Sequence, residues 1–244
     1  MHTTHIRIIG IDCATDPANV GLALGYLRGD RVSITELTTG TKKQPVSTQI
    51  VQWIQDDMPT LLALDSPLGW PSQLGILLAS HSAGDVLAIE AHDLFRRSTD
   101  QFIRKTIQKQ PMEVAADRIA RTAHAALALL AKLRTLTGQA IPLAWQPEDL
   151  TSIHAIEVYP AATLLACGYS KPKDARHSAE QAILTFLAAH VDLPTTALRI
   201  PSRHAIDAAV CVLAGADVVR GIAVPPQNIA LAKKEGWIWV RPRP

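Results

Sequence analysis

Short apolar segments alternate along the chain with segments of helical spacing, and this pattern predicts a layered α/β protein. Residues 6–12 (IRIIGID) are short and β-branched, so they predict a buried strand. Residues 20–27 and 31–37 predict two further strands, and the Arg28-Gly29-Asp30 sequence between them is a turn signal. Three consecutive strands joined by short turns indicate an antiparallel meander.

In the rest of the chain, segments with strand-like spacing of apolar residues alternate with segments of helical spacing. Strands are predicted at residues 61–65, 153–158 and 237–240, and helices at 47–57, 111–136, 160–168, 175–190 and 203–220, within a largely helical stretch from about 72 to 138. Pro111 suits the first position of its helix. No repeat or linker divides the sequence, so we expect one domain over residues 1–244 with a mixed sheet.

Composition narrows the class of protein. The 244 residues are 48% hydrophobic and 19% charged, with a net charge of +2, which excludes a disordered chain and a strongly basic protein that coats nucleic acid. The three cysteines are far apart and predict buried thiols. We see no signal peptide and no membrane span, and we therefore expect a cytoplasmic protein.

Four carboxylates stand in apolar surroundings. Asp12, Asp65 and Glu157 lie at or near the ends of predicted strands, and Asp207 lies on the apolar stripe of the predicted helix 203–220. Each acid alone has an ordinary structural explanation as a cap, turn or edge residue. Burying four unpaired carboxylates separately would use up most of a typical stability of roughly 5–15 kcal/mol. We therefore expect the four to converge around something positive.

Oxygen ligands without paired His or Cys indicate Mg²⁺ or Mn²⁺ as the bound ion. A carboxylate cluster that holds one or two such ions can activate water and stabilise the leaving oxygen of a phosphodiester. This chemistry points to nucleic acid or a nucleotide as the substrate.

At this point the sequence resembles the DUF429 family of predicted nucleases with a ribonuclease H-like fold. The resemblance is carried, in the family's order, by the segments IIGIDCA (8–14), LALDSPLGWP (62–71), RSTD (97–100), IEVYPAATL (156–164), HAIDAAVCVL (204–213) and EGWIWV (235–240). Tyr159 departs from the His that many members have after the Glu-Val pair, and Thr99 departs from a common Cys.

The resemblance implies a mixed sheet of five strands, the first three antiparallel, flanked by helices, with a helical insertion at about 72–138. It also implies that Asp12 bridges the catalytic metals and that Asp207 completes one metal site. Asp65 or Glu157 would complete the other, and the sequence leaves open which of the two is a ligand.

Basic groups near the acids are candidates for substrate binding. Arg97, Asp100 and Arg104 would share a helix face, as a phosphate-binding face or as a salt-bridged surface. Lys171 and Lys173 are either a solvated helix start or a phosphate contact. His204 could orient water or relay a proton, or it could be structural.

These observations favour a metal-dependent hydrolase of phosphodiester bonds. Two alternatives stay open: a non-catalytic binding or scaffold protein on the same fold, and an actin-like or sugar-kinase-like protein that binds nucleotide phosphates. The second needs two such halves and a Gly-rich adenosine site, and the sequence has neither G-x-x-x-x-G-K-[ST] nor G-x-G-x-x-G. The sequence does not specify DNA, RNA, a junction or a small nucleotide, nor the oligomeric state.

Overall fold

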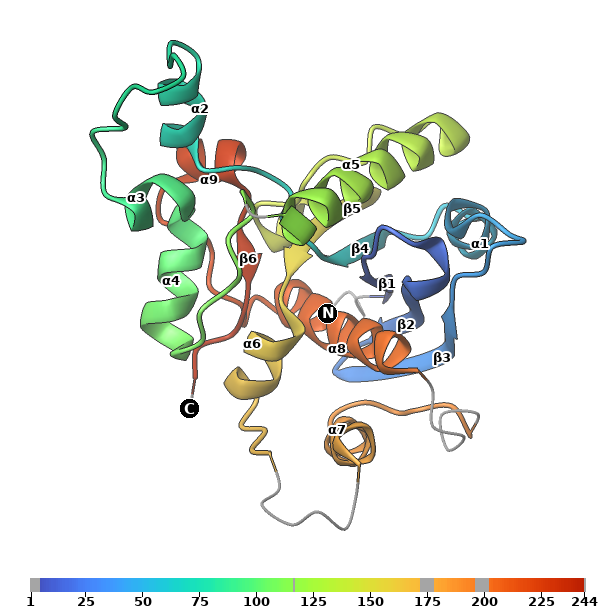
Figure 1. The fold of residues 1–244 in the computed structure, drawn as a ribbon. Coiled ribbons are helices and arrows are strands. Elements are labelled where there is room, and N and C mark those ends of the chain that lie inside the picture. The colour runs from blue at the N-terminus through green and yellow to red at the C-terminus, as the bar shows by residue number, and fades with distance from the viewer. Residues whose placement is uncertain (1–4, 116, 172–177, 196–201, 244) are drawn as a thin grey trace.

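The computed structural model describes residues 5–115, 117–171, 178–195 and 202–243. Its centre is one six-stranded sheet with the strand order β3-β2-β1-β4-β5-β6 (Figure 1). The strands are β1 (His5–Asp12), β2 (Gly21–Arg28), β3 (Arg31–Thr39), β4 (Thr60–Asp65), β5 (Ile153–Val158) and β6 (Ile238–Trp239). The first three pair antiparallel, and β4, β5 and β6 continue the sheet parallel to β1.

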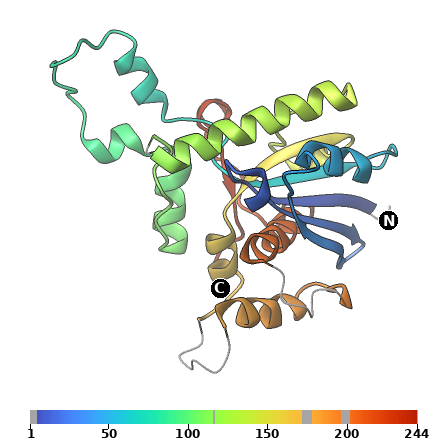
Figure 2. The same ribbon diagram turned by 45° about the vertical axis from the view of Figure 1, so that its right-hand side comes forward.

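Helices cover both faces of this sheet. They are α1 (Val46–Trp53), α2 (Ser72–Leu78), α3 (Ala91–Phe95), α4 (Ser98–Ile107), α5 (Asp117–Thr137), α6 (Pro160–Ala166), α7 (Ala179–Ala188), α8 (Arg203–Val219) and α9 (Ile229–Glu235). In Figure 2, α5 lies on one side of the sheet and α8 on the other, while α2 and α3 extend away from it. No described helix is both long and apolar enough to cross a lipid bilayer.

Period-2 alternation along the strands creates the two faces. Ile8 belongs to the core beneath α8, whereas Ile9 and Ile11 belong to the core beneath α1 and α5. The side chains of Ile8, Ile9 and Ile11 are all fully buried, so both cores are shielded from solvent. The sheet is therefore buried on both faces, and its polar residues are confined to strand ends and edges.

The close approach of α8 to β1 depends on glycine. A Cβ atom at Gly10 would lie 1.9 Å from the Ala208 carbonyl oxygen, so α8 could not keep its position. We expect Gly10→Ala to destabilise the protein by about 1–3 kcal/mol, as overpacking does. Urea unfolding of this variant beside Gly75→Ala tests the prediction, because nothing lies within 4 Å of a Cβ at Gly75. Equal stability of the two variants would contradict it.

The mixed α/β class is confirmed, as are the antiparallel pairing of the first three strands and the helices that flank the sheet. The count of five strands implied by the resemblance is wrong by one, because Ile238–Trp239 pairs in parallel with β5. Residues 72–138 contain α2 to α5, and whether they form an insertion in a single domain over 1–244 stays a prediction.

The helix predicted over 111–136 begins later, at Asp117. Pro111 and Val114 are buried instead, and Pro111 lines a cavity, so tertiary packing overrides the helix-start signal. The helix predicted over 175–190 begins at Ala179, because Ser178 caps it and accepts a hydrogen bond from the Gln181 N–H; residues 172–177 lie outside the described residues.

Candidate active site

Asp12 and Asp65 meet at the carboxyl ends of neighbouring strands. They are direct partners in the parallel pairing of β1 with β4, where adjacent strands lie about 4.8 Å apart. Paired residues of parallel strands point to the same face. Ile8 and Ala63, on the same alternation, both pack beneath α8, so the two carboxylates face the side of the sheet that α8 covers.

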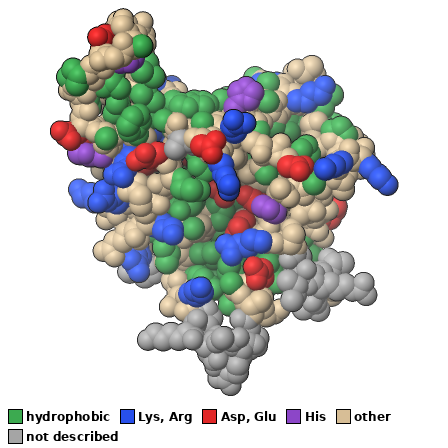
Figure 3. Space-filling model, viewed as in Figure 1, with side chains coloured by type: hydrophobic (Ala, Val, Ile, Leu, Met, Phe, Trp, Pro, Cys, Tyr) green, Lys and Arg blue, Asp and Glu red, His purple; other side chains and the backbone are tan. Residues whose placement is uncertain are grey.

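The first turn of α8 brings further polar groups to this point. His204 Nδ1 lies 2.6 Å from Asp12 Oδ2, and Arg203 Nε donates to Asp207 Oδ2 at 2.8 Å. The other oxygen of Asp207, Oδ1, is buried and accepts no hydrogen bond from the described part of the chain. Figure 3 shows acidic and histidine side chains together near the centre of this face. The acids of β1, β4 and α8 thus form one cluster.

Burial and mutual repulsion disfavour charge on these acids. Burial raises the pKa of Asp12 to about 6, although the hydrogen bond with His204 opposes the rise, and the Asp207 charge adds to it. Burial also raises the pKa of Asp65 well above its ordinary value, and the charges of Asp12, Asp207 and Glu157 add to this. No cation among the described residues lowers the pKa of Asp65. Full ionisation of the cluster would therefore leave negative charge uncompensated by the described part of the chain.

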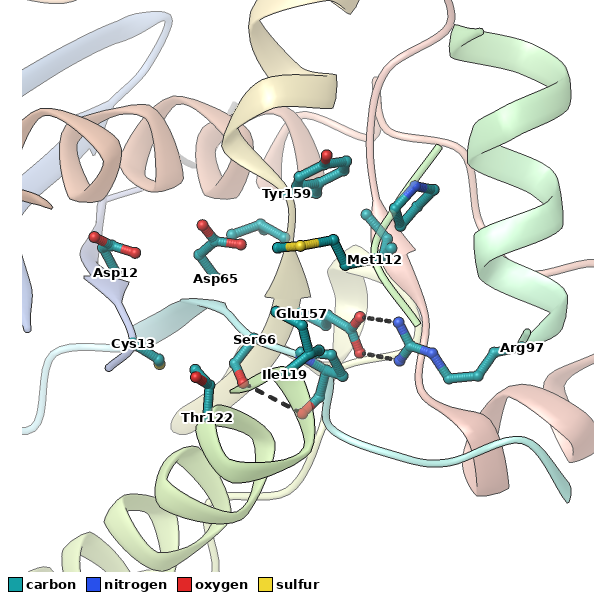
Figure 4. Close-up of a pocket in the computed structure, with 14 residues that line it drawn as sticks. Asp12, Cys13, Asp65, Ser66, Arg97, Met112, Ile119, Thr122, Glu157 and Tyr159 are labelled. Atoms are coloured by element: carbon teal, nitrogen blue, oxygen red, sulfur yellow. Dashed lines mark hydrogen bonds and ion pairs between the residues drawn. The ribbon is translucent and has the colours of Figure 1, made fainter. Parts of the chain in front are cut away.

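Glu157 points to the opposite face of the sheet. Its neighbours Ile156 and Val158 pack beneath α8, and its pairing partner Leu64 belongs to the other core. There the Arg97 guanidinium grips it with two hydrogen bonds, Nη2 to Oε1 at 2.7 Å and Nη1 to Oε2 at 2.9 Å (Figure 4). Burial raises the pKa of Glu157, and Arg97 partly offsets the rise.

Arg97 is the centre of a buried network. Its guanidinium also donates to both oxygens of Asp100 and to the carbonyl oxygen of Glu235. Arg97 and Asp100 are each only 1% exposed, so neither can grip a phosphate in this arrangement. Glu157 Oε2 accepts in addition from the backbone N–H of Leu68. The network therefore fixes the turn that follows Asp65.

The aspartate cluster suits a hard divalent cation, because the ligand atoms that its three acids offer are carboxylate oxygens. Asp207 Oδ1 is a buried acceptor with no described hydrogen-bond partner, so this oxygen is available to bind a cation. Within the described residues, however, no three His, Cys, Asp or Glu side chains are already arranged as metal ligands.

The remaining predicted site residues lie elsewhere. Arg104 and Lys171 are exposed, and Lys173 falls outside the described residues. Sequence reasoning missed Arg203, although its spacing of four residues from Asp207 on a helix is the signal for such a pair. It also missed the role of Glu235, whose carboxylate accepts hydrogen bonds from the first residues of α2 and α4, Ser72 and Ser98.

Comparison with family models matches residues 10–230 to the family described as "Protein of unknown function (DUF429)". The chain belongs to the DUF429 family. The comparison with curated proteins finds no match. Among solved structures, the DUF429 chain is similar to "T. thermophilus RuvC in complex with Holliday junction substrate", with 11% sequence identity, a TM-score of 0.39 and coverage of 91% of this chain and 100% of that chain.

The segments that carry the DUF429 resemblance converge in the fold. Three of them supply the aspartate cluster with Asp12, Asp65 and the His204–Asp207 turn. The other three supply the buried network with Arg97, Glu157 and Glu235. The two groups are connected through the LALDSPLGWP segment, which holds Asp65 at one end of the turn and donates the Leu68 N–H to Glu157 within it.

Proposed function

We propose that this protein is a metal-dependent hydrolase of phosphodiester bonds, of the nuclease type, with Mg²⁺ or Mn²⁺ held by Asp12, Asp65 and Asp207. The observation that carries the proposal is the pairing of Asp12 with Asp65 on adjacent strand ends. Asp207 lies close enough to raise the pKa of both, and none of the described cations lowers the pKa of Asp65. Such a cluster is costly unless it serves to bind a cation.

A divalent ion bound there supplies a Lewis acid that activates water and stabilises charge on the phosphate. The chain's own groups have distinct tasks. His204 Nδ1 lies 2.6 Å from Asp12 Oδ2 and its side chain is 43% exposed, so in this proposal it relays a proton between that carboxylate and solvent. Arg203 neutralises one oxygen of Asp207 and leaves the other free. Glu157 acts in this proposal as a positioning residue, because Arg97 and Leu68 occupy both of its oxygens.

A second candidate is a non-catalytic binding protein on the same fold. It is favoured by the ion pair of Glu157 with Arg97 and by that of Asp207 with Arg203. Under this alternative the acids are structural and bind no metal. The actin-like or sugar-kinase-like alternative has less support, because the described chain forms one sheet rather than two halves.

Calorimetric titration of Mn²⁺ into the wild type and Asp12→Asn separates the two candidates. We expect the wild type to bind one or two ions. Asp12→Asn should lose at least roughly 10–100-fold in affinity for the ion, because that is the cost of removing even a residue that only supports a metal ligand. Asp57→Asn, a change at an exposed acid, is the control for loss of one negative charge. If no ion binds at millimolar concentration, even with a short oligonucleotide present, the hydrolase proposal fails and the binding protein is favoured.

A further inference from the structure

A cavity of about 230 Å³ opens directly beside the aspartate cluster. Its lining includes Asp12 and Asp65 at one end, and most of the rest is apolar (Figure 4). The apolar side chains come from segments that are distant in sequence. Pro111, Met112 and Ile119 belong to the start of α5 and the residues before it, Val158 and Tyr159 to the end of β5 and the residue after it, and Ile238 to the start of β6.

We propose that this cavity binds one unpaired nucleobase, so that the substrate is a nucleotide in a single-stranded or unpaired state. The inference rests on the proposed function for its connection to phosphodiester cleavage. A flat, largely uncharged group fits the lining, because an aromatic ring and a thioether are both favourable contacts for a base. Burial raises the pKa of the Tyr159 hydroxyl, and the charge of Asp65 adds to the rise, so the Tyr159 ring lies near Asp65.

The polar groups of the cavity argue against a charged ligand inside it. Arg97 and Glu157 contribute to its lining, but each is already paired with the other, so no free charge is offered. The carboxylates of Asp12 and Asp65 would repel a phosphate placed deep in the cavity. Hydroxyls of Ser66 and Tyr159 can donate or accept, so they can contact the edge of any base without selecting one.

Exposed cations lie on the helix that forms part of the cavity lining. Ile119 and Thr122 on the first turns of α5 face the cavity, while Arg118 and Arg121 on the same turns are exposed to solvent. In this proposal the acids lie beside the scissile bond, and Arg118 is the cation of these turns that is offered to a phosphate, because Arg121 already lies 3.7 Å from Asp117. The volume is below the roughly 300–1,000 Å³ of sites for drug-sized ligands, so a base pair does not enter. The base must be unpaired, as in enzymes that extrude their target nucleotide.

The test uses the full chain, without metal and with EDTA, and single-stranded DNA that contains 2-aminopurine, whose fluorescence falls on stacking. We expect wild type to quench the probe and to bind it at least about fivefold more tightly than Met112→Ser or Tyr159→Leu. Tyr159→Phe should bind like the wild type, because it keeps the ring. Met112 is 68% exposed, so its replacement does not disturb the core, and Ile76→Ser, at a 63% exposed residue of α2, is the matched control.

Each outcome decides the proposal. Equal binding of a blunt duplex of the same sequence, or unchanged binding by Met112→Ser and Tyr159→Leu, overturns it. The mononucleotide 2-aminopurine riboside monophosphate serves as a second probe: binding as tight as that of the strand assigns the cavity to free nucleotides, and weaker binding assigns it to strands. Mn²⁺ in excess over the EDTA is then added to the same samples. Quenching before the addition without cleavage after it would retain the base site and reject the hydrolase, and cleavage without earlier quenching would do the reverse.

Discussion

Replacing Arg97 by Met is expected to lower the free energy of unfolding by about 3–5 kcal/mol. The side chain is 1% exposed and makes hydrogen bonds with Asp100, Glu157 and the Glu235 carbonyl oxygen. Met fills similar volume but leaves two buried carboxylates without their cation, and this uncompensated charge is the main cost. Chemical denaturation at pH 7.5, monitored by tryptophan fluorescence, measures the change.

Arg104→Met is the matched control, because Arg104 lies on α4, the helix that Arg97 precedes as its N-cap residue, and is exposed. It should change the stability by no more than about 0.5 kcal/mol. Adding Glu157→Gln to Arg97→Met should restore part of the loss, because it removes one of the unpaired charges. A loss below about 1 kcal/mol for Arg97→Met alone would show that the network is not a buried ion pair in solution.

Stability in the absence of divalent cations is expected to depend on pH through Asp12. Folding raises the pKa of this carboxyl from 3.8 to about 6, mainly by burial. A group with a raised pKa stabilises the folded state below its unfolded value, and this contribution is lost as the pH rises through about 6. The full effect is about 3 kcal/mol, of which roughly half falls between pH 5 and pH 7.5. The raised pKa of Asp65 acts in the same direction.

The measurement is the difference in unfolding free energy between Asp12→Asn and the wild type at several pH values in EDTA. That difference should grow in favour of Asp12→Asn as the pH rises from 5 to 7.5, whereas Asp57→Asn should give a constant difference. Mn²⁺ at pH 7.5 should stabilise the wild type and not Asp12→Asn, because the ion favours the ionised carboxylate. Parallel pH profiles for Asp12→Asn and the wild type would reject the assigned burial of Asp12.

The strands were the most predictable part of the molecule, because buried β-branched segments bounded by turn residues have few other solutions. The segment 153–158 was predicted to the residue. Helix starts were less predictable: Pro111 has the right chemistry for a first helical position, yet burial against the cavity outweighs that preference. The sixth strand was too short for its pairing to be inferred from pattern alone.

The candidate site, like the fold, could be predicted from the sequence only in part. Convergence of Asp12 and Asp65 follows from two strand ends that carry the same residue type, and the pairing register places them together. Glu157 could not be placed in this way. Whether an acid one position earlier on the neighbouring strand shares their face depends on the register of β5 against β4, which no single strand reveals. Its pairing with Arg97 is a contact between residues 60 positions apart.

The hydrogen bond from Arg97 to the Glu235 carbonyl oxygen joins residues 138 positions apart. During synthesis, Arg97 and Glu157 emerge from the ribosome well before α9 and β6, and the chain grows at roughly 5–20 residues per second. Until residues 235–239 have followed, water has access to the ion pair and the turn after Asp65 lacks its final support. The nascent protein can therefore pair β1 to β4 early, but the core beneath α8 and the support of the turn after Asp65 are completed only after residues 203–239 have emerged.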